Sequence, residues 1–305
     1  MLPISGTFLD EITHDIPSQN WGEVEWRREF ELFQAIGIDT VILIRAGYQN
    51  RCVFPSKVIP NLLPVYDDLA ELFLSLADEH NLRFFFGLYD SGFHWIRRTW
   101  WREVEINAAF IEEVVERYGH HPSFQGWYLC HEVGRNDMHV IELIRTLASK
   151  CKSVKDLPTL ISPYPHGPRQ GGEGLTLEET FEHWNRIFGD TADLLDICAF
   201  QDGQVLYEHV PDLMRGLSEL GANYGITMWS NVETFARDMP IKFPPADWRN
   251  LRWKMEAASP HVEKLITFEF SHFLSPHSCY LAARNLFRRY AEHFGIDASR
   301  WLGEQ

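Results

Sequence analysis

Eight short apolar runs recur along the chain, and the segments between them repeat apolar residues with the spacing of amphipathic helices. Most of the runs are continuously hydrophobic rather than alternating, which is typical of parallel strands covered on both faces. This alternation predicts an α/β fold, a single (β/α)8 TIM-barrel domain spanning residues 1–305. The predicted strands are Ile4–Asp10, Thr40–Ala46, Arg83–Asp90, Phe124–Glu132, Thr159–Tyr164, Leu195–Asp202, Tyr224–Glu233 and Lys264–Ser271.

Helix boundaries are indicated by glycines that follow the periodic segments and by polar residues that precede them. Gly37, Gly119 and Gly221 predict helix ends, because glycine readily adopts the left-handed conformation found there. Asp247 and Ser278 predict the N-caps of the last two helices.

Three of the loops that follow predicted strands are long. In a barrel enzyme such loops lie at the face that carries the active site, so we expect them to shape a cleft. They are Tyr48–Tyr66, Tyr164–Gly174 and Thr234–Pro245.

Charge and composition exclude two classes of partner. The chain carries 28 basic and 43 acidic residues, a net charge of −15, whereas a nucleic-acid-binding surface has to be basic. No apolar run reaches the ~18 residues that a membrane span needs. A neutral sugar remains compatible, and the 14% aromatic content supplies flat rings that can stack on a pyranose.

Cysteine usage and the N-terminus favour a cytoplasmic location. The five cysteines are scattered and odd in number, which indicates reduced thiols rather than a disulfide framework. No basic stretch followed by an apolar segment opens the chain, so no signal peptide is visible. The oligomeric state is left open by these observations.

Polar side chains collect where the predicted strands end. A ring of such groups is costly unless its members are paired or solvated in a cleft, so the ring predicts a functional site at one rim of the barrel. Its members include Asp10, Glu11, Arg45, Tyr89, Asp90, His131, Glu132, Tyr164, Asp202, Trp229, Asn231, Glu233, Glu269 and His272.

Two glutamates in this ring suggest a specific chemistry. Glu132 and Glu233 end the fourth and seventh predicted strands, from which they would face one cleft from opposite sides. Glycosidic bond cleavage needs one carboxyl to donate a proton and another to attack or to activate water. We predict Glu132 as the general acid/base and Glu233 as the nucleophile or the water-activating base.

The remaining members of the ring are predicted to bind a sugar, with no cofactor. Glu269 is also a rival for a catalytic role, because it lies inside an apolar run and must have a partner when buried. A structural carboxylate tied to Arg45 or His272 is the alternative.

A metal-dependent sugar isomerase or hydrolase is the second functional hypothesis. Oxygen and imidazole ligands from several strand ends bind divalent ions in barrel enzymes. The first strand has no H-x-H and the chain has no H-E-x-x-H, so we predict no metal. A non-catalytic carbohydrate-binding barrel is the third hypothesis. The ligands available to the metal hypothesis are Asp10, Glu132, Asp202, Glu269 and His272.

The segment G-W-Y-L-C-H-E at Gly126–Glu132 resembles the fourth-strand segment of clan A glycoside hydrolases, in which Asn-Glu ends the strand. The resemblance implies that Glu132 is the acid/base and that Glu233 stands at the nucleophile position. The asparagine that binds the sugar 2-hydroxyl in that clan is replaced by His131, so this contact is missing or is made differently.

Over nearly its whole length the chain is similar to a bacterial family of uncharacterised glycoside-hydrolase-like TIM barrels, a domain-of-unknown-function group that opens with G-T-F-L-D-E, here Gly6–Glu11. Asp39–Gly47, Phe200–Gly203 and Trp229–Glu233 carry this similarity. It implies the barrel fold and no particular substrate. The sequence as a whole therefore predicts a retaining glycoside hydrolase acting on an oligosaccharide or small glycoside.

Overall fold

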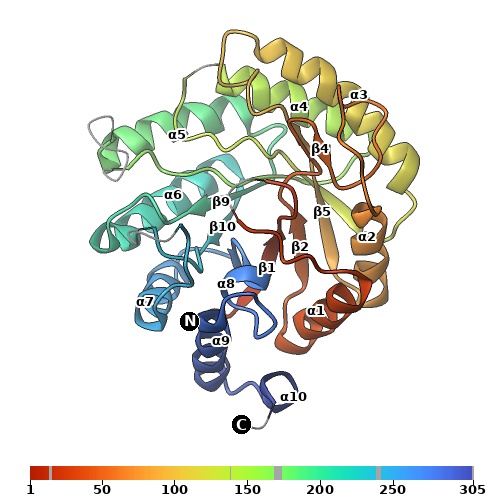
Figure 1. The fold of residues 1–305 in the computed structure, drawn as a ribbon. Helices are drawn as coiled ribbons and strands as arrows, with labels where there is room; N and C mark the ends of the chain where they lie inside the picture. Colours follow the sequence, from red (N-terminus) through yellow and green to blue (C-terminus); the bar gives the residue numbers. More distant parts are fainter. Residues whose placement is uncertain (14–15, 138, 168–173, 238–241, 304–305) are drawn as a thin grey trace.

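The structure, a computed structural model, describes residues 1–13, 16–137, 139–167, 174–237 and 242–303. Its centre is a closed barrel of parallel strands, which confirms the predicted (β/α)8 architecture (Figure 1). Each predicted strand has a counterpart there. In spatial order the strands are β1 (Ile4–Leu9), β2 (Thr40–Leu43), β5 (Arg83–Gly87), β7 (Phe124–Tyr128), β8 (Thr159–Ile161), β9 (Ile197–Gln201), β10 (Thr227–Asn231) and β11 (Lys264–Thr267), which pairs back onto β1.

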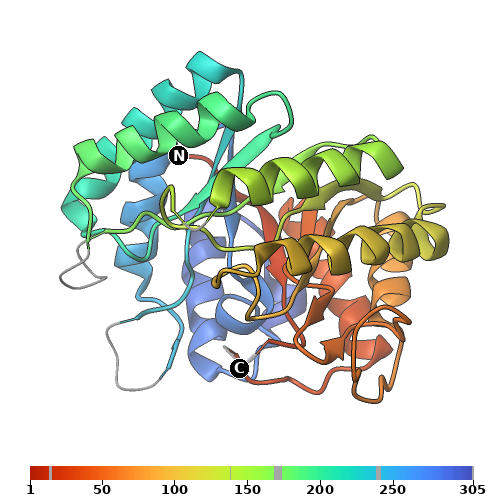
Figure 2. The ribbon, with the colours of Figure 1, turned by 90° about the horizontal axis from the view of Figure 1, so that it is seen from above.

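Helices surround the barrel as an outer layer, seen along the barrel in Figure 1 and from above in Figure 2. Each buries an apolar stripe against the strands. They are α1 (Glu23–Ile36), α2 (Leu69–Glu79), α3 (Trp100–Tyr118), α4 (Val140–Val154), α5 (Leu177–Thr191), α6 (Val210–Tyr224), α7 (Trp248–Ala258) and α9 (Leu281–Phe294). The shorter helical segments are η2 (Tyr207–His209), α8 (Phe270–Phe273) and α10 (Ser299–Leu302).

Aromatic side chains fill the inside of the barrel. The ring of Phe8 on β1 meets that of Tyr128 on β7 at 5.1 Å, and the ring of Phe85 on β5 meets that of Trp229 on β10 at 6.0 Å. Neither pair of strands is adjacent in the barrel, so these rings meet across its interior. At Gly126 a Cβ atom would lie 2.2 Å from the Phe85 ring, so the absence of a side chain there makes room for that ring.

Two of the predicted helix boundaries are wrong. α6 runs through Gly221 to Tyr224 and ends at Gly225, whose φ of 72° is left-handed. Gly221 instead allows close packing, because a Cβ there would lie 2.5 Å from the Met228 sulfur. α9 begins after Tyr280 without a side-chain cap, and the Ser278 hydroxyl accepts from the Tyr280 N–H within the preceding turn.

Other predicted boundaries are confirmed. Gly37 ends α1 with a φ of 86°, Gly119 follows α3, and the carboxylate of Asp247 caps α7 by accepting from the Arg249 N–H at 2.8 Å. The eighth strand is shorter than predicted. It ends at Thr267, because Glu269 already caps α8, which begins at Phe270.

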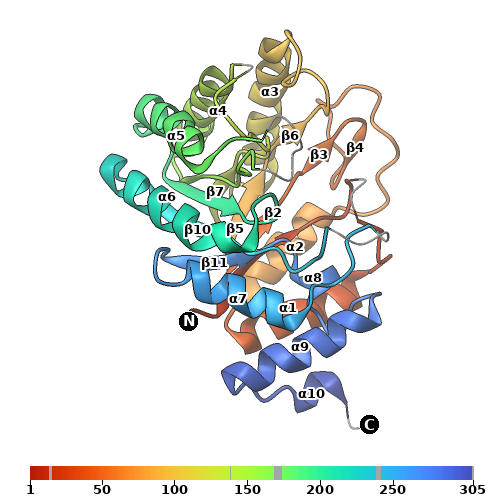
Figure 3. The same cartoon turned by 90° about the vertical axis from the view of Figure 1, so that its left-hand side faces the viewer.

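A small second sheet extends the rim of the barrel (Figure 3). It consists of β3 (Gly47–Tyr48), β4 (Arg51–Cys52) and β6 (Tyr89–Asp90), with β3 parallel to β6 and antiparallel to β4. Along the chain, β3 follows β2 and β6 follows β5. The pairing of β3 with β6 therefore holds Tyr48 and Asp90 at the rim.

All five cysteines are free. Within the described ranges, none of the helices combines the length and the apolar character needed to cross a membrane.

Candidate active site

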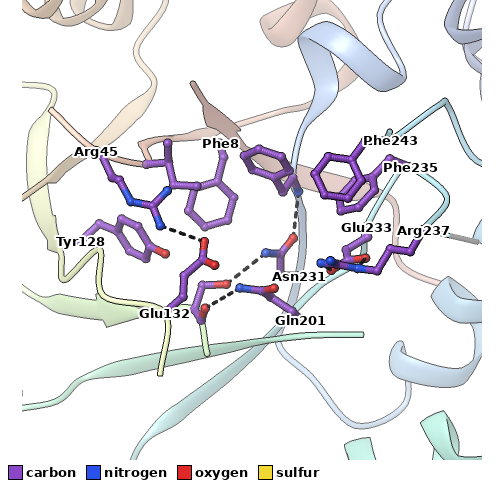
Figure 4. A pocket seen from close by; sticks show the side chains of 13 residues that line it. Phe8, Arg45, Tyr128, Glu132, Gln201, Asn231, Glu233, Phe235, Arg237 and Phe243 are labelled. Atoms are coloured by element: carbon purple, nitrogen blue, oxygen red, sulfur yellow. Dashed lines mark hydrogen bonds and ion pairs between the residues drawn. The ribbon is translucent and has the colours of Figure 1, made fainter. Parts of the chain in front are cut away.

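A pocket of about 160 Å³ lies at the C-terminal ends of the barrel strands. Glu132, just beyond β7, and Glu233, just beyond β10, both line it (Figure 4). β8 and β9 separate these two strands in the barrel, so the carboxylates reach the pocket from different sides. This central pocket is lined by Phe8, Ile44, Arg45, Tyr128, Glu132, Ser162, Gln201, Asn231, Glu233, Phe235, Arg237, Phe243 and Phe268.

Arg45 holds Glu132 on one side of the central pocket. Its Nη2 lies 3.3 Å from Glu132 Oε1, and its Nε donates to Asp90 Oδ2 at 3.2 Å. Burial disfavours the charged guanidinium, but the two carboxylates outweigh this effect and raise the pKa of Arg45. Arg45 is therefore a fixed cation beside Glu132, whose side chain is still 32% exposed and accessible to a ligand.

Two tyrosines stand near the same carboxylate. Burial raises the pKa of Tyr164 and raises that of Tyr128 well above its usual value, and the charge of Glu132 adds to both effects. Both phenols are therefore neutral near neutral pH and able to donate a hydrogen bond. Figure 4 places Tyr128 beside Arg45 and Glu132.

Glu233 is fixed more tightly than Glu132. Arg237 grips its carboxylate with two bonds, from Nε to Oε2 at 2.9 Å and from Nη2 to Oε1 at 2.6 Å. The backbone N–H of Glu233 donates to Asp202, and its backbone carbonyl accepts from Lys254 Nζ at 2.8 Å. Such a bidentate pair fixes orientation as well as charge, so the Glu233 carboxylate has one defined position at the pocket wall.

Gly203 makes room for this pair. A Cβ atom at position 203 would lie 1.8 Å from Glu233 Oε2 and 2.4 Å from Arg237 Nε. Glu233 Oε2 and Arg237 Nε are bonded to each other in the bidentate contact, so neither atom can move away from a Cβ at position 203 without breaking that contact. The preceding residue, Asp202, is buried, which raises its pKa to about 6; Lys254 opposes this shift and Glu233 adds to it.

A chain of hydrogen bonds connects the strand ends between the two carboxylates (Figure 4). Asn231 Nδ2 donates to Ser162 Oγ at 3.0 Å, and its Oδ1 accepts from the Phe268 N–H at 2.8 Å. Gln201 Nε2 donates to the Ser162 carbonyl at 2.9 Å. These bonds set the orientation of the two amides and make the pocket floor rigid.

Two further cavities adjoin the central pocket. One, of about 280 Å³, shares Arg45 and Glu132 with it, and we call it the outer lobe. The other, of about 450 Å³, shares Glu233, Phe235 and Arg237 with it, and we call it the side pocket. The outer lobe is lined by Thr13, Arg45, Tyr48, Asp90, Gly92, Trp95, Ile96, Glu132 and Tyr164. The side pocket contains Asp202 and Lys254 among its lining residues.

The structure brings seven of the predicted site residues to these cavities. They are Arg45, Asp90, Glu132, Tyr164, Asp202, Asn231 and Glu233. Their roles stay predictions, but their positions agree with a shared site. The other seven lie outside the three cavities.

Trp229, a predicted sugar contact, lies too deep in the barrel to hold a sugar. Its ring packs on Phe85 inside the barrel, with Lys264 Nζ 5.2 Å from the ring centroid. Only 2% of the residue is exposed.

His131, Tyr89 and Asp10 are engaged elsewhere. His131 Nε2 lies 3.1 Å from Glu103 Oε1, and the Tyr89 hydroxyl donates to the Gln49 carbonyl. Asp10 Oδ1 accepts from the Thr13 N–H and closes the turn after β1. The clan-type contact to a 2-hydroxyl is therefore not provided by His131 in this arrangement.

Glu269 and His272 form a buried pair at the start of α8. The Glu269 carboxylate accepts from the N–H groups of Ser271 and His272 at 2.8 Å each and from the His272 ring. The other ring nitrogen of His272 bonds the Pro17 carbonyl at 2.7 Å. Burial lowers the pKa of His272, but Glu269 outweighs it and raises the pKa to about 9. This capping arrangement favours the structural interpretation of Glu269.

Glu11 lies near this pair and gives a prediction on stability. Burial raises its pKa from 4.5 to about 7, with Glu269 adding to the shift and His272 opposing it. The folded state then binds a proton more tightly than the unfolded state, so the resulting stabilisation is complete below pH 4.5 and lost as the pH rises through 7. We expect the contribution of Glu11 to the free energy of unfolding to fall by up to about 3 kcal/mol over this range.

Urea unfolding at pH 5, 6, 7 and 8 measures this effect. Glu11→Gln is expected to make the pH dependence shallower without removing it, because the raised pKa of His272 still contributes a loss of stability above pH 6.5. Glu105→Gln, an exposed position on α3, is the control and is expected to leave the slope unchanged. A Glu11→Gln variant with the wild-type slope would assign the pH dependence to other groups.

The five side chains available to the metal hypothesis do not gather into one group in the described part of the chain. Among the described residues, two groups of three side chains bring possible ligand atoms within 4.8 Å of one another. They are Glu71, His120 and His121, and Asp90, Glu103 and His131; neither contains any of the five proposed ligands. In the second group Asp90 already accepts from Arg45, Gly92 and Trp95, so its oxygens are committed to protein donors.

Several pocket residues were not predicted from the sequence. Ser162 lies at a strand end, where the rule that selected Asn231 would also have found it. Arg237, Phe235 and Phe243 come from the long loop Thr234–Pro245, which was expected to shape the cleft without naming residues. Residues 168–173 and 238–241 of the long loops lie outside the described residues.

The chain is similar to a protein family and to several solved structures. A domain of unknown function, DUF4434, matches residues 4–280. The crystal structure of a "putative alpha-L-fucosidase" from Bacteroides thetaiotaomicron shares 42% identity, covers 97% of this chain and 94% of its own, and has a TM-score of 0.94. None of the curated proteins compared with this chain matches it.

Two distant structures share the fold. An intracellular xylanase from Thermoanaerobacterium saccharolyticum is 10% identical, with 87% of this chain and 85% of that chain covered and a TM-score of 0.53. A hyperthermostable endo-1,4-beta-D-mannanase from Thermotoga petrophila is 12% identical, with 87% of each chain covered and a TM-score of 0.54. The predicted similarity to a family of uncharacterised barrels is confirmed: because the family match spans most of its length, the chain belongs to the DUF4434 family.

Proposed function

We propose that this protein is a glycoside hydrolase in which Glu132 and Glu233 carry out the reaction. The observation that carries the proposal is the placement of both carboxylates on one pocket, from strands that are not adjacent. A pair of carboxyl groups flanking a cleft is the arrangement that most glycosidases use. The name of the 42% identical Bacteroides relative and the fold of the xylanase and mannanase support the same class.

The proposed mechanism retains the anomeric configuration. Glu132, the more exposed carboxyl, protonates the glycosidic oxygen, and one oxygen of Glu233 attacks the anomeric carbon as the C–O bond breaks. Glu132 then removes a proton from the water that hydrolyses the glycosyl-enzyme. The other oxygen of Glu233 keeps its bond to Arg237, so the nucleophile stays oriented throughout.

The walls of the central pocket suit one sugar ring. Its volume of about 160 Å³ is below the ~300 Å³ at which most small-molecule pockets begin. Phe8, Phe235 and Phe268 supply apolar faces for the ring, while Arg45 and Gln201 supply donors for its hydroxyls. A monosaccharide unit at the end of a chain or on a small aglycone is therefore the proposed substrate unit.

The proposal is tested with 4-nitrophenyl glycosides of α-L-fucose, β-D-xylose, β-D-mannose and β-D-glucuronic acid, with and without EDTA. We expect release of 4-nitrophenol from at least one substrate, insensitive to EDTA, with a first-formed sugar of retained configuration by NMR. Inversion would make Glu233 the base that activates water. Loss of activity with EDTA would favour the metal hypothesis, and binding without turnover the carbohydrate-binding barrel.

A further inference from the structure

The central pocket and the outer lobe meet at two side chains that line both of them. Arg45 and Glu132 are the lining residues that the two cavities have in common. Glu233 lines the central pocket and does not line the outer lobe. The proton donor therefore stands between two chambers, whereas the nucleophile belongs to the central one.

The outer lobe presents aromatic surface to whatever enters it. Tyr48, Trp95 and Tyr164 are all half-buried lining residues, so part of each remains accessible from the lobe. Aromatic faces of this kind stack on sugar rings and on aromatic groups alike. Asp90 and Arg45 add polar groups at the wall.

The indole of Trp95 is held in one orientation. Its Nε1–H donates to Asp90 Oδ1 at 2.9 Å, and its ring meets the His131 ring at 5.5 Å with an interplanar angle of 76°. Glu103 bonds both His131 and the Ser91 N–H, which fixes the loop that carries Trp95. This explains what His131 does in place of a sugar contact: it supports the tryptophan.

We propose that the outer lobe binds the leaving group of the substrate, a neutral sugar or aryl aglycone, with Trp95 as its platform. The inference rests on the proposed function. A general acid has to reach the oxygen that joins the two halves of the substrate. If the glycone lies beside Glu233 in the central pocket, the half beyond Glu132 lies in the outer lobe.

The chemical step determines that the aglycone leaves on the side of Glu132. The Glu132 proton moves to the glycosidic oxygen, the bond to the anomeric carbon breaks as Glu233 forms its own, and the aglycone leaves as a neutral alcohol. The side pocket is the other neighbour of the central pocket, but it is reached past Glu233 and Arg237. A leaving group placed there would be separated from its proton donor, so the outer lobe is the chamber that fits.

The test compares two leaving groups on the same sugar, the best one from the glycoside panel. A 4-nitrophenyl group would fill the outer lobe, whereas the fluoride of a glycosyl fluoride is too small to contact Trp95. For Trp95→Ala we expect kcat/KM to fall about tenfold on the aryl glycoside, the size of one good aromatic contact, and to stay near wild type on the fluoride. Trp95→Phe, which keeps a ring, is expected to retain most of the aryl activity.

Trp101→Ala is the matched control, because Trp101 is a 48% exposed tryptophan on the nearby helix α3 outside the lobe. Equal losses on both substrates would assign Trp95 to holding Asp90 and Arg45 and overturn the proposal, as would no loss on either. A chain that hydrolyses neither substrate refutes the proposed function instead.

A binding measurement distinguishes failure of the leaving-group proposal from failure of the proposed function. With Glu233→Gln to prevent turnover, calorimetry is expected to show tighter binding of the 4-nitrophenyl glycoside than of the methyl glycoside. Adding Trp95→Ala is expected to remove this difference. Equal affinities in the Glu233→Gln protein would refute the aromatic lobe even if the enzyme hydrolyses glycosides.

Discussion

Replacing Glu233 with glutamine is expected to lower kcat by about 10⁴-fold, the largest effect of any single change in the site. The amide cannot form the glycosyl-enzyme, although it preserves the shape of the side chain that Arg237 holds. Thermal unfolding and circular dichroism are expected to show a folded protein. Glu178→Gln, an exposed position in the first turn of α5, is the control and is expected to keep full activity.

Glu233→Ala tests the retaining role directly. The space left by the carboxylate allows azide to attack the anomeric carbon in its place, so sodium azide is expected to restore turnover on a 4-nitrophenyl glycoside. The product should be a glycosyl azide of inverted configuration, identified by NMR. Failure of azide together with an inverted product from the wild-type enzyme would make Glu233 a base instead of a nucleophile.

Replacing Glu132 with glutamine is expected to lower activity by roughly 10²- to 10⁴-fold on substrates with poor leaving groups. Such substrates need a proton on the departing oxygen. The 2,4-dinitrophenolate leaving group departs without being protonated. The kcat/KM of the variant on a 2,4-dinitrophenyl glycoside is therefore expected to change little. Arg45 keeps its bond to Asp90 in this variant, which limits any structural disturbance.

The comparison of the two leaving groups is the measurement that matters for Glu132. Glu142→Gln, exposed on α4, provides the matched control. Equal losses on both substrates would indicate a binding contribution, and unchanged activity on the poor leaving group would move the search for the acid to Asp202. Its buried carboxyl, with a pKa of about 6, lies next to Glu233 in the side pocket.

The barrel was predictable because strand runs buried on both faces leave a continuous hydrophobic signal. The positions of Glu132 and Glu233 followed from it, since polar residues just after such runs lie at one rim. Depth along a strand was not predictable in the same way. Trp229 and Asn231 are two residues apart and share a face of β10, yet only Asn231 lines the pocket, one layer above the tryptophan.

The contacts made by loop residues could not be predicted from sequence patterns. Arg237 pairs with Glu233 across an irregular segment, and Trp95 is oriented by a hydrogen bond to Asp90 and a ring contact with His131. No periodicity encodes such contacts, because they depend on how the loops fold against the rim. Glu269 was misplaced for a related reason: its apolar neighbours continue the strand pattern, but its carboxylate caps the helix that replaces the strand.

The absence of a side chain at Gly203 also provides a way to sort the family. A DUF4434 protein with alanine or any larger residue at this position cannot hold the Glu233–Arg237 pair in the same geometry, because the added carbon would overlap both partners. The identity of the residue at position 203, glycine or a larger residue, therefore serves as a sequence marker. It separates relatives that can share this chemistry from those in which the same barrel has to serve another purpose, before any of them is expressed.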